Sequence, residues 1–288
     1  MNTSPPLESL SPVAWSLPHG VELHTVRAGH GVPLIFIHGA MGDWRSWSAQ
    51  WDAFTARFDC VSYSRRYSFP NRNDMPSPHH SALDEAHDLA LLMDAMHIEQ
   101  AVLVGSSYGG FTALALAVES PSRVQAVIAV EPPMMKYAHQ TPEGLAIAQA
   151  FRRDVIDPAN AAFRAGLDER AAQIMTGGIN GAQSTVNVGP ALERRLQNLR
   201  AMKMLALSSD EFPWLSPDQL GNLAMPILLL SGRQTPDVHR AIFHNVCTAM
   251  PQARHAWIEG AGHGVTREQP DAFNQLALDF LSQFSPQA

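Results

Sequence analysis

The chain of 288 residues has little of what several classes of protein require. It has two cysteines, Cys60 in a strand-like apolar run and Cys247 in a helix-like one, so buried thiols are expected rather than a disulfide. No apolar run approaches the roughly 20 residues of a membrane-spanning helix. The start, MNTSPPLESLSPVAW, lacks the basic and apolar regions of a secretory signal and is interpreted as a loosely held polar lead-in.

Basic residues are also scarce. The sequence has 20 Lys and Arg against 27 Asp and Glu, a formal net charge of −7. Phosphate binding needs a basic face, so nucleic acid is not expected as a partner. Together these absences predict a cytoplasmic protein with no membrane partner. A homodimer is compatible with the sequence, but no feature requires one.

Short apolar runs alternate along the chain with amphipathic helical patterns. The runs expected to form strands are 21–26, 33–38, 58–63, 101–105, 124–130, 226–232 and 253–259; the main expected helices are 80–98, 108–119 and 270–284. Several runs are apolar on both faces, which is typical of strands covered by helices on both sides. The alternation predicts an α/β fold with a mostly parallel sheet.

The alternation stops between residues 132 and 225. This interval has Ala-rich helical pieces at 143–156 and 191–207, a Gly/Asn-rich loop at 176–183, and no convincing strand. We therefore expect a core domain in two parts, 1–131 and 226–288, that carries a helical cap at 132–225.

The stretch AVLVGSSYGGF contains a G-x-S-x-G pattern between an apolar strand and an apolar helix. The pattern is centred on Ser107, so Ser106 is the filler residue. A nucleophile elbow belongs at this place, because glycines at 105 and 109 let the sharp turn pass close to its neighbours. The alternative is a Gly-rich strand-to-helix turn with a capping serine.

Two further stretches favour the catalytic interpretation. The turn IFIHGAMGDW can direct the backbone N–H of Ala40 above the serine, where it would form an oxyanion hole with the N–H of Tyr108. His38 in this turn is expected to be a structural hydrogen-bonding residue. The late stretch EGAGHGVTREQP places His263 in a Gly-rich loop after the last strand, from which a base can reach the serine.

In this order, H-G-x-x-G, G-x-S-x-G and G-x-G-H resemble the motifs of the α/β-hydrolase superfamily. The resemblance extends from about Val21 to Phe284, and residues 132–225 correspond to the variable cap. It implies the α/β-hydrolase fold, with Ser107 as the nucleophile and His263 as the general base.

The acid of the triad departs from the usual pattern. Relatives commonly carry an aspartate three residues after the glycine that closes the penultimate strand, but here Thr235 has that place. Asp237 is the nearest carboxylate and could instead cap the next helix. Some members of the superfamily place the acid at the end of the strand after the nucleophile helix, where this chain has Glu131. A carboxylate that ends an apolar run needs a reason for its desolvation, so Glu131 is favoured and Asp237 is the alternative.

By the same resemblance, a serine nucleophile implies an acyl-enzyme and a carboxylic-ester hydrolase or lactonase that needs no cofactor. The same residues would serve a C–C bond hydrolase of diketone-type substrates, or a cofactor-free perhydrolase or haloperoxidase. Because fold alone does not determine function, a ligand-binding protein on a hydrolase scaffold is the non-enzyme alternative.

The remaining chemically notable residues are given structural interpretations. Arg65 and Arg66 either orient a substrate or, as we favour, form ion pairs with carboxylates. His79, His80 and His87 are interpreted as solvated loop residues, and no metal site is expected. Glu259 and Glu268 are expected to be surface charges. Cap side chains either line the pocket or pack in the cap interior; these are Met134, Met135, Tyr137, Phe212 and Trp214.

Overall fold

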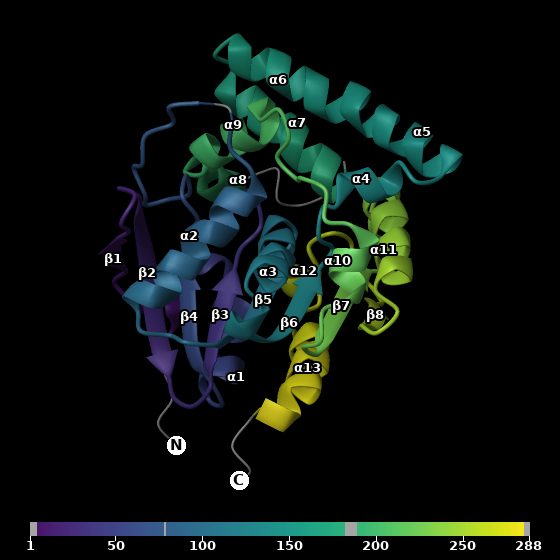
Figure 1. Cartoon of the computed structure of the whole chain (residues 1–288). Helices are drawn as coiled ribbons and strands as arrows, with labels where there is room; N and C mark the ends of the chain where they lie inside the picture. The colour runs from purple at the N-terminus through teal and green to yellow at the C-terminus, as the bar shows by residue number, and fades with distance from the viewer. Residues whose placement is uncertain (1–4, 78, 182–188, 285–288) are drawn as a thin grey trace.

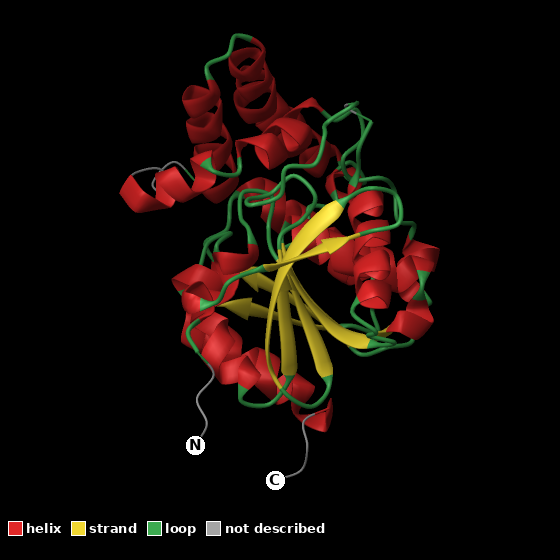
Figure 2. Cartoon of the chain, turned by 90° about the vertical axis from the view of Figure 1, so that its left-hand side faces the viewer, coloured by secondary structure: helices red, strands yellow, loops and turns green. Residues whose placement is uncertain are grey.

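The computed structural model describes residues 5–77, 79–181 and 189–284. Its centre is an eight-stranded sheet (Figures 1 and 2). In chain order the strands are β1 Val13–Ser16, β2 Glu22–Gly29, β3 Pro33–Ile37, β4 Asp59–Tyr63, β5 Ala101–Ser106, β6 Val124–Val130, β7 Ile227–Gly232 and β8 Arg254–Ile258. The seven strands expected from the sequence are all present, and their ends lie within three residues of the predicted ones.

The strands are arranged in the order β1-β2-β4-β3-β5-β6-β7-β8. Both pairings of β2 are antiparallel, and every pairing from β4 to β8 is parallel. The carboxyl ends of the parallel strands therefore meet at one edge of the sheet. Loops at that edge hold ligands in open α/β sheets, which makes it the first place to look for a site.

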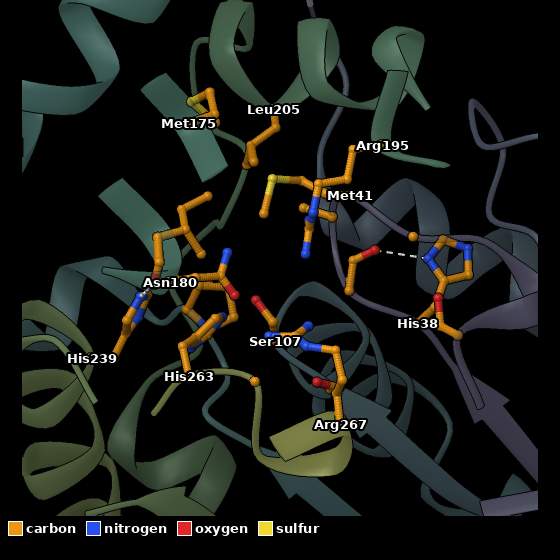
Figure 3. Close-up of a pocket in the computed structure, with 18 of the residues that line it drawn as sticks. His38, Met41, Ser107, Met175, Asn180, Arg195, Leu205, His239, His263 and Arg267 are labelled. Carbon is orange, nitrogen blue, oxygen red and sulfur yellow. Dashed lines mark hydrogen bonds between the residues drawn. The ribbon is translucent and has the colours of Figure 1, made fainter. Parts of the chain in front are cut away.

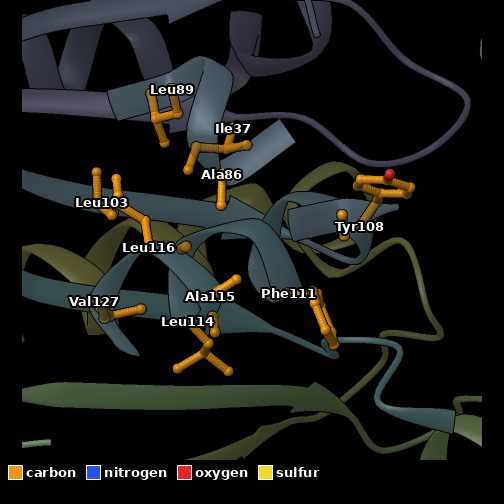
Figure 4. Packing of buried hydrophobic residues seen from close by; sticks show 14 of the residues in the cluster. Ile37, Ala86, Leu89, Leu103, Tyr108, Phe111, Leu114, Ala115, Leu116 and Val127 are labelled. Atoms are coloured by element: carbon orange, nitrogen blue, oxygen red, sulfur yellow. The ribbon is translucent and has the colours of Figure 1, made fainter. Parts of the chain in front are cut away.

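Helices cover both faces of the sheet, as the apolar strands require. The core helices are α1 Ser48–Thr55, α2 Ala82–Ala95, α3 Tyr108–Glu119, α11 Asp237–Ala249, α12 Val265–Glu268 and α13 Pro270–Phe280. Alternate residues of one strand face opposite sides. Leu103 belongs to the cluster that includes side chains of α2 and α3 (Figure 4), whereas Val104 belongs to the cluster that includes side chains of α1 and α13. Both cysteines are free thiols, as predicted; Cys60 is buried as expected, whereas Cys247 is only half-buried.

The described part of the segment between β6 and β7 is helical. Its helices are α4 Met135–Ala138, α5 Pro142–Phe151, α6 Asp157–Arg164, α7 Asp168–Asn180, α8 Gly189–Leu196, α9 Leu199–Leu207 and α10 Pro217–Gly221, and a π-helical turn, Arg152–Ile156, joins α5 to α6. Ten buried side chains between Val155 and Ala206 form a hydrophobic cluster that is separate from the two clusters on the sheet. Helices α5 to α9 lie beyond the carboxyl edge of the strands (Figure 1).

Two local predictions were wrong. Of the loop expected at 176–183, residues 176–180 form the end of α7, because Gly178 lets this helix pack directly against the side chain of Val155; residues 182 and 183 lie outside the described ranges. The polar lead-in is also not loose in its described part. Leu7 is buried in the core, and Val13–Ser16 pair with β2 as an edge strand. The two prolines and the polar residues around Leu7 conceal this packing in the sequence.

No helix in the described ranges combines the length and the apolar character that crossing a membrane would need.

Candidate active site

Ser107 occupies a sharp turn between β5 and α3. Its φ is +52°, a left-handed backbone conformation that is uncommon for residues other than glycine, and its N–H donates to the carbonyl of Val130 at 2.7 Å. A Cβ at Gly105 would collide with the backbone of Gly109, and a Cβ at Gly109 would collide with the carbonyl of Ile37. The two glycines of the motif are therefore required by the close approach of α3, β5 and β3.

His263 and Glu131 are hydrogen-bonded to each other, although they follow different strands. Glu131 comes directly after β6, and His263 lies in the loop after β8. Imidazole Nδ1 of His263 lies 2.5 Å from Oε2 of Glu131. Both side chains are buried, and His263 lines the same cavity as Ser107 (Figure 3). No hydrogen bond joins Ser107 to His263 here; such bonds are often long in enzymes without substrate.

Four donors surround the carboxylate of Glu131. Besides His263, it accepts hydrogen bonds from Ser231 Oγ at 2.6 Å, the N–H of Gly232 at 2.9 Å and Thr235 Oγ1 at 2.8 Å. Burial alone would raise the pKa of Glu131, but the hydrogen bonds from His263 and Ser231 and the nearby imidazoles lower it below its ordinary value. The carboxylate is thus held ionised. Thr235, at the place of the usual acid, supports Glu131.

Asp237 lies away from this cluster. It is the first residue of α11 rather than its cap, its side chain is 74% exposed, and it pairs with Arg240 at 3.2 Å. Glu259 is likewise exposed and pairs with Arg233. Glu268 is more than a surface charge, because its Oε2 accepts the N–H of Gly262 at 2.7 Å and so shapes the loop that carries His263.

His38 holds the turn that contains Ala40. Its Nε2 accepts the backbone N–H of Arg65 at 3.0 Å, so the proton is on Nδ1, which donates to the carbonyl of Gly39 at 2.7 Å. Burial, and then the charge of Arg65, lower the pKa of His38 to about 3, which keeps the ring neutral. Gly39 lies close to Ser107, as the 3.5 Å between its ideal Cβ position and the Ser107 Cβ indicates. Ala40 and Ser107 therefore line one cavity.

Arg65 and Arg66 form ion pairs, as favoured from the sequence. Arg65 is buried, pairs with Glu85 at 3.2 Å, and lies over the ring of Tyr108 at 3.7 Å. Arg66 makes two hydrogen bonds to the carboxylate of Asp88. Together with the hydrogen bond from the Arg65 N–H to His38, these contacts hold the loop after β4 against the turn that contains Ala40.

The interpretation of His80 as a solvated residue was wrong. Its ring is buried, lies 3.2 Å from Oε1 of Glu85 and packs edge-on against Tyr67. Burial lowers the pKa of His80, but the hydrogen bond that its ring donates to Glu85 and the negative charge of that carboxylate outweigh this and raise it. The tertiary pairing with Glu85, which local sequence does not reveal, accounts for the difference. His79 and His87 are exposed, but His87 lies on α2 rather than in a loop.

The cavity above Ser107 has a volume of about 830 Å³. Its walls are mainly apolar and come from both the core and the segment 132–225; they include Met41, Pro133, Phe151, Ile156, Met175, Ile179 and Leu205. Of the five cap side chains singled out in the sequence, Met135 and Phe212 line the cavity. Met134 and Tyr137 are buried in the core, and Trp214 is 42% exposed and stacks on Tyr137.

Sequence reasoning missed His239, which lies directly beside His263. The two rings are nearly parallel, with centroids 3.9 Å apart. His239 Nε2 lies 3.0 Å from the carbonyl of Ile179 on α7, so it carries the proton. Burial, and then the charge of His263, lower the pKa of His239 to about 3. A histidine at the third position of a helix gives no local signal of such a contact.

Glu131, His239 and His263 are also the one group of potential metal ligands within the described residues, with donor atoms within 4.8 Å of one another. The group fits a metal poorly, because Glu131 already accepts four hydrogen bonds and the proton of His239 Nε2 is engaged with a backbone carbonyl. The arrangement fits proton transfer between a hydroxyl, an imidazole and a carboxylate.

The family model for the alpha/beta hydrolase family matches residues 34–276. The chain therefore belongs to the α/β-hydrolase family, a family of hydrolases, and the order and orientation of its strands agree with that assignment.

Relatives within this class carry out different reactions. The chain is 25% identical over 266 residues to 2-hydroxy-6-oxo-6-phenylhexa-2,4-dienoate hydrolase of Comamonas testosteroni, covering 91% of each chain. It is 24% identical to carboxylesterase YbfK of Bacillus subtilis over 86% of this chain and 79% of that one. The crystal structure of the latter superposes with a TM-score of 0.71 at 19% identity, covering 96% and 94% of the two chains. An epoxide hydrolase structure from metagenomes of hot environments superposes at 0.76, with 22% identity and 94% and 98% coverage.

Proposed function

We propose that this chain is a serine hydrolase that cleaves a carboxylic ester or a lactone. The observation that carries the proposal is the 2.5 Å contact between His263 and a buried, ionised Glu131, in the cavity that also holds the strained Ser107. A serine with a neighbouring histidine and a buried carboxylate is the constellation for acyl transfer. In this proposal Ser107 is the nucleophile, His263 the base and Glu131 the acid.

The reaction has two halves. The Ser107 hydroxyl oxygen attacks the substrate carbonyl, and its proton passes to Nε2 of His263. The imidazolium returns that proton to the leaving alcohol as the C–O bond breaks, which leaves an acyl-enzyme. A water molecule then attacks the acyl carbon by the same route and releases the acid. Throughout, Glu131 keeps the proton on Nδ1 of His263 and stabilises the imidazolium.

The negative charge on the carbonyl oxygen would be stabilised by backbone N–H groups. Tyr108 is the first residue of α3, where helix N–H groups have no partner within the helix, and Ala40 lies in the turn held by His38. Two such donors fixed before the reaction are worth several kcal/mol of barrier in comparable sites, roughly 3 kcal/mol for each donor.

We infer that residues 132–225 act as a cap over the site, with the core formed by 1–131 and 226–288. The apolar walls that this segment contributes favour a small organic substrate with hydrocarbon parts. The net charge of −7 supports the expectation that nucleic acid is not a partner. A cytoplasmic location remains the expectation from the sequence.

One observation favours a second candidate, a C–C bond hydrolase. The dienoate hydrolase of Comamonas testosteroni matches this chain over 91% of both lengths. The same triad could serve that chemistry, with water or Ser107 attacking a ketone and a carbon leaving group taking up the proton. Turnover of vinylogous diketones, compared with turnover of 4-nitrophenyl esters and lactones, separates the two candidates.

The test is covalent labelling at Ser107. A fluorophosphonate should add one label to the wild-type chain, located by peptide mass spectrometry on Ser107. Ser107→Ala should lose the label and reduce kcat for ester hydrolysis by roughly 10³-fold or more.

The adjacent serine provides the matched control. Ser106→Ala should still be labelled and should keep its activity within a few-fold of wild type. Loss of labelling in Ser106→Ala but not in Ser107→Ala would mean that the elbow is centred on the wrong serine. A labelled enzyme that turns over diketones and no ester would favour the second candidate.

A further inference from the structure

Five arginines line the cavity above Ser107, and their partners differ. They are Arg45, Arg152, Arg194, Arg195 and Arg267. Four of them are paired with carboxylates: Arg45 with Asp43, Arg152 with Asp157, Arg194 with Glu8 and Arg267 with Glu268. Arg195 has neither an ion pair nor a side-chain hydrogen bond with any residue that the structure describes.

The stretch just before α8 that lies outside the described ranges offers no carboxylate to Arg195. Residues 182–188, which lie outside the described ranges near the start of α8, contain neither aspartate nor glutamate. The charged group that acts on Arg195 is another cation, Arg267. Burial, and then the charge of Arg267, lower the pKa of Arg195 to about 10, so it is still charged at neutral pH. A half-buried arginine that has no carboxylate partner of its own and lies beside a second arginine is unfavourable until an anion binds.

The position of Arg195 is suited to a ligand. It lies on α8, in the segment that covers the site, and its side chain points from there into the cavity toward Ser107 (Figure 3). Arg267 enters the same cavity from α12, just after the loop that carries His263. The guanidinium of Arg195 is thus available to a substrate whose reacting carbon is at Ser107.

We propose that Arg195 binds a carboxylate of the substrate, so that the natural substrates are esters or lactones that carry a free carboxylate. This rests on the proposed function, because it places the reacting carbonyl at Ser107. A guanidinium offers parallel N–H donors that match both oxygens of a carboxylate. Met41, Met175 and Leu205 line the same cavity as Arg195 (Figure 3), and these apolar walls suit a hydrocarbon linker between the carboxylate and the ester.

The first experiment compares a charged and a neutral ester of similar length. Initial rates are measured for 4-nitrophenyl hydrogen glutarate and 4-nitrophenyl hexanoate with wild-type enzyme and Arg195→Met. The variant should lose about 10- to 100-fold in kcat/KM for the glutarate ester, as expected for a charged hydrogen bond. For the hexanoate the change should stay within about threefold, because its chain end has no charge to bind.

Two further variants make the comparison specific. Arg153→Met removes the same charge from an exposed arginine that pairs with Asp154 outside the cavity, and it should leave both rates within about twofold. Arg195→Lys keeps the charge and should recover part of the glutarate activity. Equal losses on both substrates in Arg195→Met, or no loss on either, would overturn the carboxylate site.

A binding measurement separates this proposal from the proposed function, because it needs no turnover. Calorimetric titration with 4-phenylbutyrate and with the neutral 4-phenylbutanol is carried out on wild type and Arg195→Met. Arg195→Met should bind 4-phenylbutyrate at least tenfold more weakly than wild type does and should bind 4-phenylbutanol equally well. If this result holds while no ester is hydrolysed, the ester hydrolase is rejected and the carboxylate site stands. The carboxylate site is rejected if esters are hydrolysed while 4-phenylbutyrate binds wild type and Arg195→Met alike. It is also rejected if 4-phenylbutyrate does not bind wild type at millimolar concentration.

Discussion

The rings of His239 and His263 lie nearly parallel, with their centroids 3.9 Å apart and an interplanar angle of 17°. His239 is held in turn by its hydrogen bond to the carbonyl of Ile179 on α7. One face of the proposed catalytic imidazole is therefore covered by a second ring that is tied to the cap. A protonated His239 in this place would repel an imidazolium at His263.

His239 should make the protein less stable in mild acid. Its pKa is about 3 in the folded chain, against 6.5 for an ordinary histidine, so between these values the unfolded chain binds the extra proton. The contribution of His239 to the free energy of unfolding is fully present above pH 6.5 and is lost as the pH decreases toward 3. From pH 7 to pH 5 this one group contributes a loss of about 2 kcal/mol. Urea unfolding of wild type and His239→Phe at both pH values measures it.

The phenylalanine variant keeps a ring against His263 but cannot titrate. Its stability should therefore fall less between pH 7 and pH 5 than that of wild type, while His38 contributes equally in both. An identical fall in the two proteins would show that His239 is not the titrating group.

Glu131→Gln should separate the acid of the triad from its alternative. The amide keeps the volume but can donate a hydrogen bond to Nδ1, which favours the wrong tautomer of His263, so kcat should drop roughly 10²- to 10⁴-fold. Asp237→Asn should leave kcat nearly unchanged, because Asp237 is exposed and pairs with Arg240. Steady-state kinetics with circular dichroism as a folding check decides the matter. A dead Asp237→Asn beside an active Glu131→Gln would reverse the assignment.

Arg65 should matter far more to stability than an exposed arginine does. Arg65→Met leaves the buried Glu85 with His80 as its remaining charged partner, and removing one member of a buried ion pair costs about 3–5 kcal/mol. Arg240→Met breaks an exposed pair with Asp237 and should cost no more than about 1 kcal/mol. Chemical unfolding of both variants gives the comparison. Similar losses of unfolding free energy in the two variants would mean that the pair between Arg65 and Glu85 adds little to the stability of the fold.

Gly109→Ala should prevent correct formation of the elbow, because its Cβ would meet the carbonyl of Ile37. Fluorophosphonate labelling should be lost, together with much of the folded protein. Gly221→Ala is the control, since a Cβ there meets only the carbonyl of Ala249 at 3.7 Å. It should fold and be labelled normally. Normal labelling of Gly109→Ala would mean that β3 and α3 can separate at little cost.

The fold was predictable because its strands are continuous apolar runs with turn residues between them. The prediction failed where packing overrides local preference. Leu7 lies among prolines and polar residues yet enters the core, and Gly178 allows a helix where a glycine-rich stretch predicts a loop. In both cases the deciding contact is with a residue distant in sequence.

The candidate site was predictable only where a residue has characteristic neighbours in the sequence. Ser107 and His263 have characteristic neighbours, whereas the environment of Glu131 depends on Ser231 and Thr235, about a hundred residues later in the chain. His239 and Arg195 carry no motif at all. Their positions in the site are defined by contacts with residues distant in sequence, which only the structure shows.

Because Glu131 stands at the end of β6, the proposed acid precedes the segment 132–225 in the sequence. The proposed nucleophile and acid both lie in one continuous β-α-β unit, residues 101–131, which is complete before the cap begins. Only the base comes from the far side of the inserted segment. Replacing the proposed cap with that of a relative would therefore leave the stretch with serine and carboxylate intact, but it would remove the Ile179 carbonyl that holds His239 against His263.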